Sequence, residues 1–328
     1  MFTGKTIFIT GGTGSWGREL VKQMLQRNPK EIIIFSRNES SQVEMKREFE
    51  DPRLRFCIGD IRDRDALIAA SAGTDYLFHL AALKHVPVCE EQPLEAVKTN
   101  IFGTQNVIEA AIHNKVKKVM YISTDKASNP SNLYGMTKAV GERLIIQANL
   151  LPTETRFVCV RGGNVLGTNG SVIHLFLKQI KQERRVGITD LNMTRFFLTL
   201  EDAIGLLFKA SEDSLGGEIF VLLMPTCRIL DLAEVLIDTL GVPNVQVEET
   251  GIRPGEKIHE ILYSEFESRT TVIYDEHYLV VLPTMEIPGL KEHYQASPPV
   301  SEGSYSSSEL LMTKDEIKQL LVKGRFFP

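Results

Sequence analysis

An acid, two amines and a phenol stand close together near the middle of the chain. They belong to Asp125, Lys126, Lys138 and Tyr134, with Thr124 beside them. The apolar segment before them has the pattern of a buried strand, which puts the cluster at a strand's carboxyl end, where open parallel sheets bind ligands. Tyr134 and Lys138 are four residues apart and share one helix face. An ammonium lowers the pKa of a nearby phenol, so the pair predicts a redox step at a carbon that bears oxygen.

The first half of the chain alternates short apolar runs with helical patterns. The expected strands are 6–10, 31–35, 54–58, 76–80, 118–123 and 156–161, and the expected helices include 17–26, 40–49 and 93–114. This alternation predicts the α/β class, with a doubly wound parallel sheet covered by helices on both faces. We expect a cofactor domain over 1–162. A smaller, mixed α/β substrate domain should occupy 163–328, with some of its segments returning to the first.

The second half is less regular. Helical patterns recur at 173–183, 200–211 and 229–240, and 270–281 has β character. The Ser- and Pro-rich stretch 297–308 is expected to be an exposed connection. A charged amphipathic helix at 313–322, with Thr313 as its N-cap, closes the chain.

Composition narrows the class of protein. The chain has 328 residues, of which 43% are hydrophobic and 24% charged, with a net charge of -5. These values are typical of a globular protein and favour neither nucleic acid nor an anionic membrane as partner. Without a spanning segment or signal peptide, a cytoplasmic location is expected. The four scattered cysteines are interpreted as reduced thiols, and no cluster has metal-site spacing. They are Cys57, Cys89, Cys159 and Cys227.

A glycine-rich turn follows the first strand. Gly11, Gly14 and Gly17 would let the chain leave the strand tightly, approach a pyrophosphate and pack a helix on the sheet. The helix N-terminus supplies amide donors to the phosphates. Thr13, Ser15 and Trp16 complete the turn. Between a first strand and a first helix, this turn favours a Rossmann-type dinucleotide site over a glycine turn without a ligand.

The end of the second strand predicts which dinucleotide binds. An NAD site usually offers a carboxylate there, whereas this chain has Ser36 and Arg37. Arginine can pair bidentately with a 2′-phosphate, which favours NADP(H) over NAD(H); the alternative is a solvated surface arginine. Asp60 and Ile61 should lie along the adenine. Ala81 and Ala82, after the fourth strand, would leave room for the middle of the cofactor.

These motifs resemble the extended short-chain dehydrogenase/reductase family over nearly the whole chain. Within it, the chain is most similar to the UDP-N-acetylglucosamine 4,6-dehydratases of bacterial surface-sugar biosynthesis. Thr124-Asp125-Lys126 is the most specific feature, since ordinary 4-epimerases lack the Asp-Lys pair and dehydratases of glucose nucleotides carry Asp-Glu. Further matching stretches are Leu83 to Pro87, Asn132 to Gly135, Arg161 to Gly167 and Met193 to Phe197.

The resemblance implies that UDP-N-acetylglucosamine loses water across C5 and C6 after oxidation at C4. Tyr134 would take the C4 hydroxyl proton, helped by Lys138, which also holds the nicotinamide ribose, while Thr124 bonds the C4 oxygen. Lys126 would be the C5 base and Asp125 the acid at C6. NADP would accept the C4 hydride and return it to C6.

The elimination roles require unusual protonation states. Lys126 must be neutral and Asp125 must carry a proton, so we expect burial and the neighbouring Lys138 to lower the pKa of Lys126. The alternative is a plain salt bridge between the two residues at a strand end.

The residues expected to contact substrate are less sharply defined by pattern. Lys84 and His85 follow the fourth strand and contact the sugar or form a surface loop. Asn164 is expected to bond the diphosphate or the acetamido sugar. Arg195 and Arg253 are candidate phosphate clamps, with an ion pair inside the chain as the alternative. Glu256, in the same loop as Arg253, is expected at the uridine ribose.

Three readings of the whole chain compete: the 4,6-dehydratase, a UDP-sugar 4-epimerase in which Asp125 and Lys126 are idle, and a non-catalytic NADP-binding scaffold. Within the dehydratases, retaining members are often long, membrane-attached and carry methionine in place of Tyr134. The tyrosine and the length of this chain favour inversion at C5, and short retaining enzymes keep retention open. Family members usually form homodimers or larger assemblies, here through 93–114 and 134–149.

Overall fold

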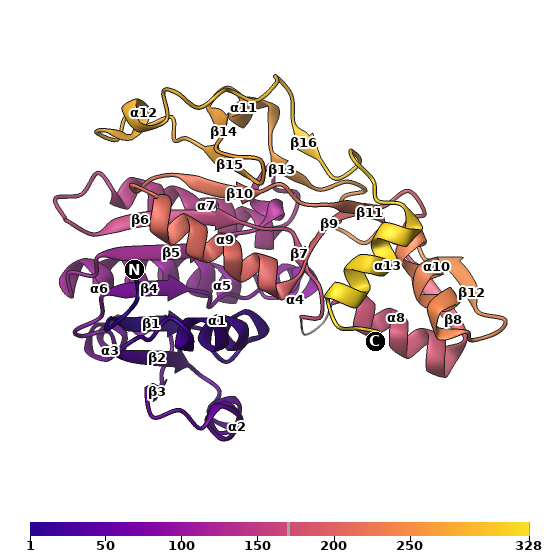
Figure 1. Cartoon of the computed structure of the whole chain (residues 1–328), viewed down its shortest axis with the longest axis horizontal. Coiled ribbons are helices and arrows are strands. Elements are labelled where there is room, and N and C mark those ends of the chain that lie inside the picture. Colours follow the sequence, from indigo (N-terminus) through magenta and orange to yellow (C-terminus); the bar gives the residue numbers. More distant parts are fainter. Residues whose placement is uncertain (169–170, 328) are drawn as a thin grey trace.

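One nine-stranded sheet organises most of the chain (Figure 1). The computed structural model describes residues 1–168 and 171–327. The strand order is β3-β2-β1-β4-β5-β6-β10-β15-β14; every pair from β3 to β10 is parallel, and β15 and β14 are antiparallel. The strands are β1 (Thr6–Thr10), β2 (Glu31–Ser36), β3 (Leu54–Ile58), β4 (Tyr76–His79), β5 (Lys118–Ile122), β6 (Arg156–Arg161), β10 (Ile219–Leu222), β14 (Thr271–Ile273) and β15 (Tyr278–Val281). The predicted doubly wound sheet is confirmed.

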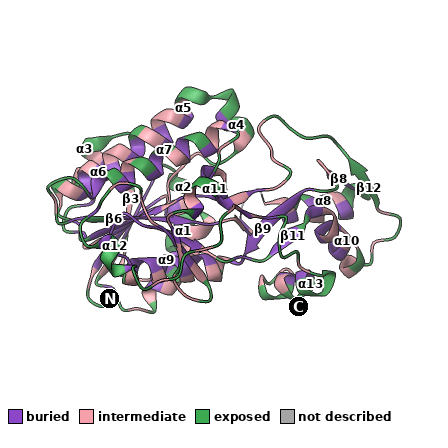
Figure 2. Cartoon of the chain, turned by 90° about the horizontal axis from the view of Figure 1, so that it is seen from above, coloured by how far each residue is buried: buried purple, intermediate pink, exposed green. Residues whose placement is uncertain are grey.

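Helices cover both faces of this sheet (Figure 2). One face carries α1 (Ser15–Leu25) and α9 (Leu200–Asp213), which contact each other; the other carries α3 (Arg64–Ala70), α6 (Gly103–His113) and α7 (Leu133–Ala148). Because both faces are covered, strands such as β1 are buried along their whole length and have continuous apolar sequences. The remaining helices of the first half are α2 (Glu39–Phe49), α4 (Val86–Glu91) and α5 (Pro93–Val97).

The expected helix 93–114 is one helical run with an irregular centre. Between α5 and α6 the chain forms the π-helical segment η1 (Lys98–Phe102). The wider turn buries Thr99 and Asn100. Asn100 bonds both the backbone of Leu83 and the hydroxyl of Thr137, so this segment connects the loop after β4 to α7.

The second half of the chain contributes to two places. Strands β10, β14 and β15 and helix α9 join the large sheet, while a smaller part has its own hydrophobic core around Phe176, Leu232 and Ile317. Its elements are β7 (Asn164–Val165), α8 (Val172–Glu183), β8 (Arg185–Ile188), β9 (Thr194–Leu198), β11 (Thr226–Arg228), α10 (Ile229–Leu240), β12 (Gln246–Glu249) and α13 (Lys314–Lys323). Segments of 163–328 therefore contribute to both cores, and the domain boundary at 162/163 stays a prediction.

The expectation of a wholly exposed connection at 297–308 is wrong at its end. Tyr305 and Ser306 form β16, which pairs with β13 (Ile261–Tyr263). Tyr305 stacks near Phe196 and Tyr263, and Ser307 is fully buried. Serine side chains prefer solvent unless their hydroxyl groups find hydrogen-bond partners inside the protein. The hydroxyl of Ser307 has such partners in Thr194 and Glu260.

The predicted N-cap of the last helix is confirmed. Thr313 caps α13 in a capping box with Glu316. All four cysteines are free, and three of them are buried. None of the helices formed by residues 1–168 and 171–327 has the length and apolar character needed to cross a membrane. The short helices α11 (Glu265–Ser268) and α12 (Leu290–His293) complete the fold.

A buried ionic network connects β6, α7 and α11. The guanidinium of Arg161 lies 2.7 Å from Glu142 and 2.9 Å from Glu267, and its side chain is 1% exposed. It also donates a hydrogen bond to the carbonyl oxygen of Leu262, the central residue of strand β13. Burial raises the pKa of Glu267, but the Arg161 charge outweighs it and lowers the value to about 2. The network therefore holds the α11 and β13 region against the sheet as ionised groups.

We predict that Arg161→Met destabilises the protein by about 3–5 kcal/mol, because it leaves two buried carboxylates without a counter-charge. Urea unfolding followed by circular dichroism measures this change. The control is Arg185→Met, which removes an exposed pair with Glu183 and should cost less than about 1 kcal/mol. Equal effects of the two substitutions would contradict the structural role of the network.

Candidate active site

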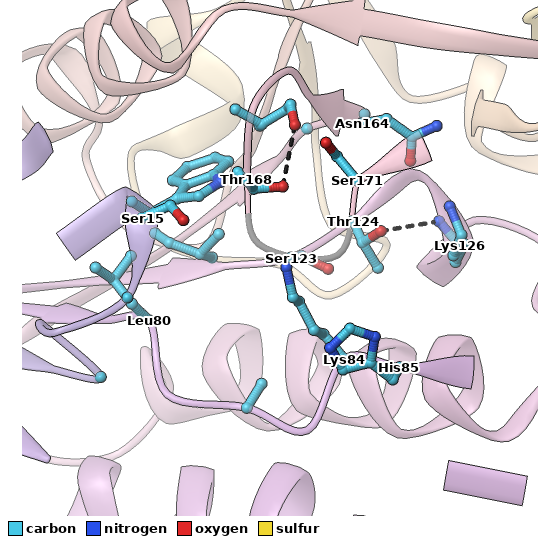
Figure 3. A pocket seen from close by; sticks show the side chains of 18 of the residues that line it. Ser15, Leu80, Lys84, His85, Ser123, Thr124, Lys126, Asn164, Thr168 and Ser171 are labelled. Carbon is cyan, nitrogen blue, oxygen red and sulfur yellow. Dashed lines mark hydrogen bonds between the residues drawn. The ribbon is translucent and has the colours of Figure 1, made fainter. Parts of the chain in front are cut away.

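A cleft of about 600 Å³ lies at the carboxyl ends of the central parallel strands (Figure 3). The glycine turn follows β1, the segment Leu80 to His85 follows β4, and Ser123 and Thr124 follow β5. The strand order reverses at β1, which lies between β2 and β4, so this edge is the topological switch point where such sheets bind ligands. Residues 162–168 and α8 close the opposite side.

The glycine turn has the shape that a bound pyrophosphate needs. Gly11 has φ +68°, and a Cβ there would lie 2.8 Å from the backbone of Ala81. A Cβ on Gly17 would lie 2.2 Å from the carbonyl oxygen of Gly12, so only glycine lets α1 start this close to β1. Gly14, Ser15 and Trp16 also line the cleft. The glycines leave backbone without side chains beside the first turn of α1. Such a surface fits the phosphates of a dinucleotide.

The predicted adenosine-side residues lie outside the cleft, beyond the glycine turn. Arg37 is half exposed at the end of β2, with Nη1 3.8 Å from Asp60 Oδ2 after β3. The hydroxyl of Ser36 accepts a hydrogen bond from Gln42, and Asp60 is held by Arg62. Ile61 is buried. Thr13 also does not line the cleft; its carbonyl oxygen accepts from Arg18.

The catalytic candidates come together at the other end of the cleft. Thr124 caps the short helix η2 (Asp125–Ala127) and lines the cleft with Lys126, Tyr134 and Lys138. Figure 3 shows Thr124 and Lys126 side by side, with Lys84 and His85 reaching in from the loop after β4. Asp125 lies behind them: it is fully buried and absent from the lining. Its Oδ1 accepts from Thr124 Oγ1 at 2.9 Å and from Lys126 Nζ at 3.0 Å.

The expected activation of Tyr134 by Lys138 is wrong for this structure. Burial raises the pKa of Tyr134 to about 12, and the charges and bonds that oppose burial come from Lys126 and Thr124. Lys138 Nζ instead donates to the carbonyl oxygen of Ile122 and lies 3.9 Å above the ring of Tyr121. Burial lowers the pKa of Lys138 to about 7, so its charge is only partly present at neutral pH.

The expected lowering of the pKa of Lys126 is also wrong. Burial alone would lower it, but Asp125 and then Glu260 raise it above the ordinary lysine value. Lys126 Nζ lies 3.0 Å from Asp125 Oδ1 and 3.3 Å from Glu260 Oε1. The amine is therefore a charged ammonium between two buried carboxylates.

The predicted substrate residues divide into two groups. Lys84, His85 and Asn164 line the cleft, and burial lowers the pKa of Lys84. Arg195, Arg253 and Glu256 do not line it. Arg253 is exposed and pairs with Glu256 at 3.7 Å.

Arg195 is buried among backbone carbonyls rather than aimed at a phosphate. Its guanidinium donates to the carbonyl oxygens of Thr194, Ile258 and Lys257 at 2.7–3.0 Å. The alternative of an internal role therefore describes Arg195 better than a phosphate clamp.

Glu260 is the main residue that sequence reasoning missed. It stands a few residues after the Arg253 to Lys257 turn, and the only local signal was that it follows that turn directly before a strand. The fold brings β13 against η2, which places Glu260 beside Lys126. Asn100 was also missed, because a π-helical turn cannot be read from residue spacing.

Comparisons with known proteins agree with this geometry. Residues 7–282 match the model of a family described as polysaccharide biosynthesis protein. A Campylobacter jejuni protein named UDP-N-acetylglucosamine 4,6-dehydratase (inverting) is 45% identical over 85% of this chain and 84% of its own length. A Rickettsia canadensis protein named UDP-glucose 4-epimerase is 39% identical over 98% of this chain and 96% of its own length.

A solved structure, that of Pen from Bacillus thuringiensis, superposes with a TM-score of 0.94 at 41% identity and covers 100% of both chains. The match therefore includes the smaller part that closes the cleft as well as the large sheet. Together with the glycine turn and the Thr124 to Lys138 cluster, these findings show that the chain belongs to the polysaccharide biosynthesis protein family, a branch of the extended short-chain dehydrogenases/reductases.

Proposed function

We propose that the protein is a hydro-lyase that uses tightly bound NADP to convert UDP-N-acetylglucosamine to a UDP-4-keto-6-deoxy-N-acetylhexosamine. The observation that carries this proposal is the Asp125–Lys126 pair beneath a cleft that also holds Tyr134. A 4-epimerase needs only the proton transfer at the C4 hydroxyl. An acid and an amine held together at the same place provide the groups that an elimination requires.

In the first step Tyr134 takes the proton of the C4 hydroxyl. A nicotinamide held beside Tyr134 and Lys138 would supply the hydride acceptor and donor that oxidation at C4 and reduction at C6 require. Lys126 and Thr124 supply the positive charge and the hydrogen bond that favour the Tyr134 phenolate. We propose that Lys138 holds the nicotinamide ribose, as the family resemblance implies.

Before the second step Lys126 passes one proton to Asp125 Oδ1, which lies 3.0 Å from its Nζ. The neutral Lys126 then removes the proton from C5, which the C4 ketone has made acidic. The C6 hydroxyl leaves as water with a proton that originates on Asp125. Because Asp125 lies behind the cleft, this proton has to pass through Thr124, whose hydroxyl is 2.9 Å away and lines the cleft. The step ends with Asp125 as a carboxylate and Lys126 as an ammonium.

On the substrate side, we propose that Lys84, His85 and Asn164 contact the sugar and diphosphate, since all three line the cleft. The relatives named inverting support the proposal that C5 is reprotonated on the opposite face. NMR of the product at C5 tests this: retention of configuration would contradict it.

A second candidate function is UDP-sugar 4-epimerisation, because Rickettsia relatives that match 98% of this chain carry that name. Incubation with UDP-N-acetylglucosamine followed by mass spectrometry separates the two. Loss of one water supports the dehydratase. An unchanged mass with a C4 epimer supports the epimerase, and no turnover supports a non-catalytic NADP-binding scaffold.

We predict that Lys126→Ala still binds UDP-N-acetylglucosamine but exchanges the C5 proton with deuterated solvent about 10²–10⁴-fold more slowly, the usual contribution of a general base. Exchange is followed by mass spectrometry, and C4 oxidation separately by the absorbance of the reduced cofactor. Lys181→Ala, on the exposed side of α8, is the matched control. Exchange at the wild-type rate after normal C4 oxidation would refute the role of Lys126 as base.

For the cofactor, we predict that Arg37→Ala weakens NADP binding by about 10–100-fold and changes NAD binding less than about twofold. The reason is that a charge-assisted bond to the 2′-phosphate is lost. Isothermal titration of the cofactor-free protein measures both constants, with Arg47→Ala on the exposed side of α2 as control. Equal weakening of the two cofactors would exclude the 2′-phosphate contact.

We also propose a homodimer or larger assembly of this chain through the helical run 93–114 and α7. Leu94, Phe102, Met136 and Val140 expose large apolar side chains on these helices, at 61%, 57%, 48% and 42%. We predict that Phe102→Glu lowers the mass measured by light scattering, while Leu310→Glu, at an exposed site elsewhere, leaves it unchanged. An unchanged mass for both would place the contact on another surface.

A further inference from the structure

The ammonium of Lys126 has a second buried carboxylate beside it. Glu260 Oε1 lies 3.3 Å from Lys126 Nζ, and the Glu260 side chain is 3% exposed. Asp125 comes from the same short helix as Lys126, but Glu260 comes from the far segment that leads into β13. Two parts of the chain distant in sequence therefore meet at one amine.

The segment that carries Glu260 is held by buried polar bonds on both sides. Ser307 is fully buried. Its hydroxyl accepts a hydrogen bond from the Glu260 amide, and its own amide donates to the Glu260 carbonyl oxygen. The guanidinium of Arg195 donates hydrogen bonds to the carbonyl oxygens of Lys257 and Ile258, which come shortly before Glu260 in the sequence. These contacts fix the backbone of Glu260 and leave its carboxylate directed at Lys126.

The ionisable groups that interact with Lys126 come from several elements. Asp125 belongs to η2 itself, Tyr134 to α7, Arg195 to β9, and Lys257 and Glu260 to the segment before β13. Arg195 Nε is 3.9 Å from Glu260 Oε1, farther than the 3.3 Å to Lys126 Nζ. Lys126 is therefore the closest cation to Glu260 among these groups.

Stability alone does not account for this carboxylate. Glu260 Oε2 is buried and has no hydrogen-bond partner within residues 1–168 and 171–327. The same is true of Asp125 Oδ2. A buried acceptor without a donor opposes folding. Such an arrangement is expected where function requires a charge at a given place.

We propose that Glu260 is a positioning residue for the elimination: it holds the Lys126 amine at the cleft and stabilises the ammonium that forms there. The proposal rests on the proposed function. In the step, the C5–H bond breaks and an N–H bond forms on Lys126. The electron pair becomes the C5–C6 double bond, and the C6–O bond breaks as water leaves with the proton from Asp125. The Asp125–Lys126–Glu260 arrangement in the structure is the charge state that this step produces.

The test measures C5 proton exchange as a function of pH in Glu260→Gln. Removing a negative charge beside Lys126 makes the ammonium less stable, so Lys126 loses its proton at lower pH. We expect the ascending limb of the exchange profile to move to lower pH by about one unit or more, and the plateau rate to fall about tenfold. A merely structural role would lower the rate at every pH and leave the limb in place, and that result would overturn the proposal.

Glu260→Asp keeps the charge and shortens the side chain, so its limb should stay at the wild-type pH while its plateau falls. Circular dichroism shows whether Glu260→Gln folds. If it does not, the test rests on Glu260→Asp: an exchange rate at the plateau equal to that of the wild type would overturn the proposal. Glu248→Gln, in the exposed strand β12, controls for the loss of one charge and should match wild type. If the wild-type protein removes no water from UDP-N-acetylglucosamine, the proposed function itself fails. If the wild-type protein does remove water but the ascending limb of Glu260→Gln stays at the wild-type pH, only the role of Glu260 is refuted.

Discussion

The candidate active cleft depends on one largely enclosed cation, the ammonium of Lys126, whose side chain is 18% exposed. Taking an ammonium out of water is costly unless opposite charges replace the lost hydration, and here Asp125 and Glu260 do so from two sides. Three segments meet at this amine: η2, the residues that lead into β13, and Ser307, which bonds the backbone of Glu260. If one of the two carboxylates moved away, the ammonium would lose part of its compensation. The amine lines the cleft, while the two carboxylates lie behind it.

The second part of the chain completes a site that the first part begins. The parallel sheet brings the glycine turn, Ala81 and Thr124 to one edge, because parallel strands have their carboxyl ends on the same side. Asn164 and the start of α8 line the opposite side of the cleft, and Glu260 adds a second carboxylate to the pair that Lys126 makes with Asp125. The Arg161 network, which connects β6 to α7 and α11, holds the two contributions together.

Lys126 influences both halves of the proposed reaction. Its charge opposes the burial that raises the pKa of Tyr134, and we propose that the same amine is the base at C5. Lys138, which resembles the usual activating lysine, is turned toward the Ile122 carbonyl oxygen and the Tyr121 ring, and burial lowers its pKa to about 7. In the proposed reaction the charged form of Lys126 would favour the Tyr134 phenolate, and its neutral form would be needed for elimination.

The sequence by itself determined the sheet, the glycine turn and the Thr124 to Lys138 cluster, because these depend on local patterns: apolar runs, helical spacing and glycines with no room for a Cβ. It also identified the family through the Thr-Asp-Lys run. Tertiary structure alone decided the electrostatics. The pKa of Tyr134 is raised by burial, and that of Lys126 by Asp125 and then Glu260. The internal bonds of Arg195 and the buried contacts of Ser307 are made with the segment that carries Glu260. Coulomb energy and desolvation depend on distances in space, and no spacing along the chain states that residue 260 lies beside residue 126.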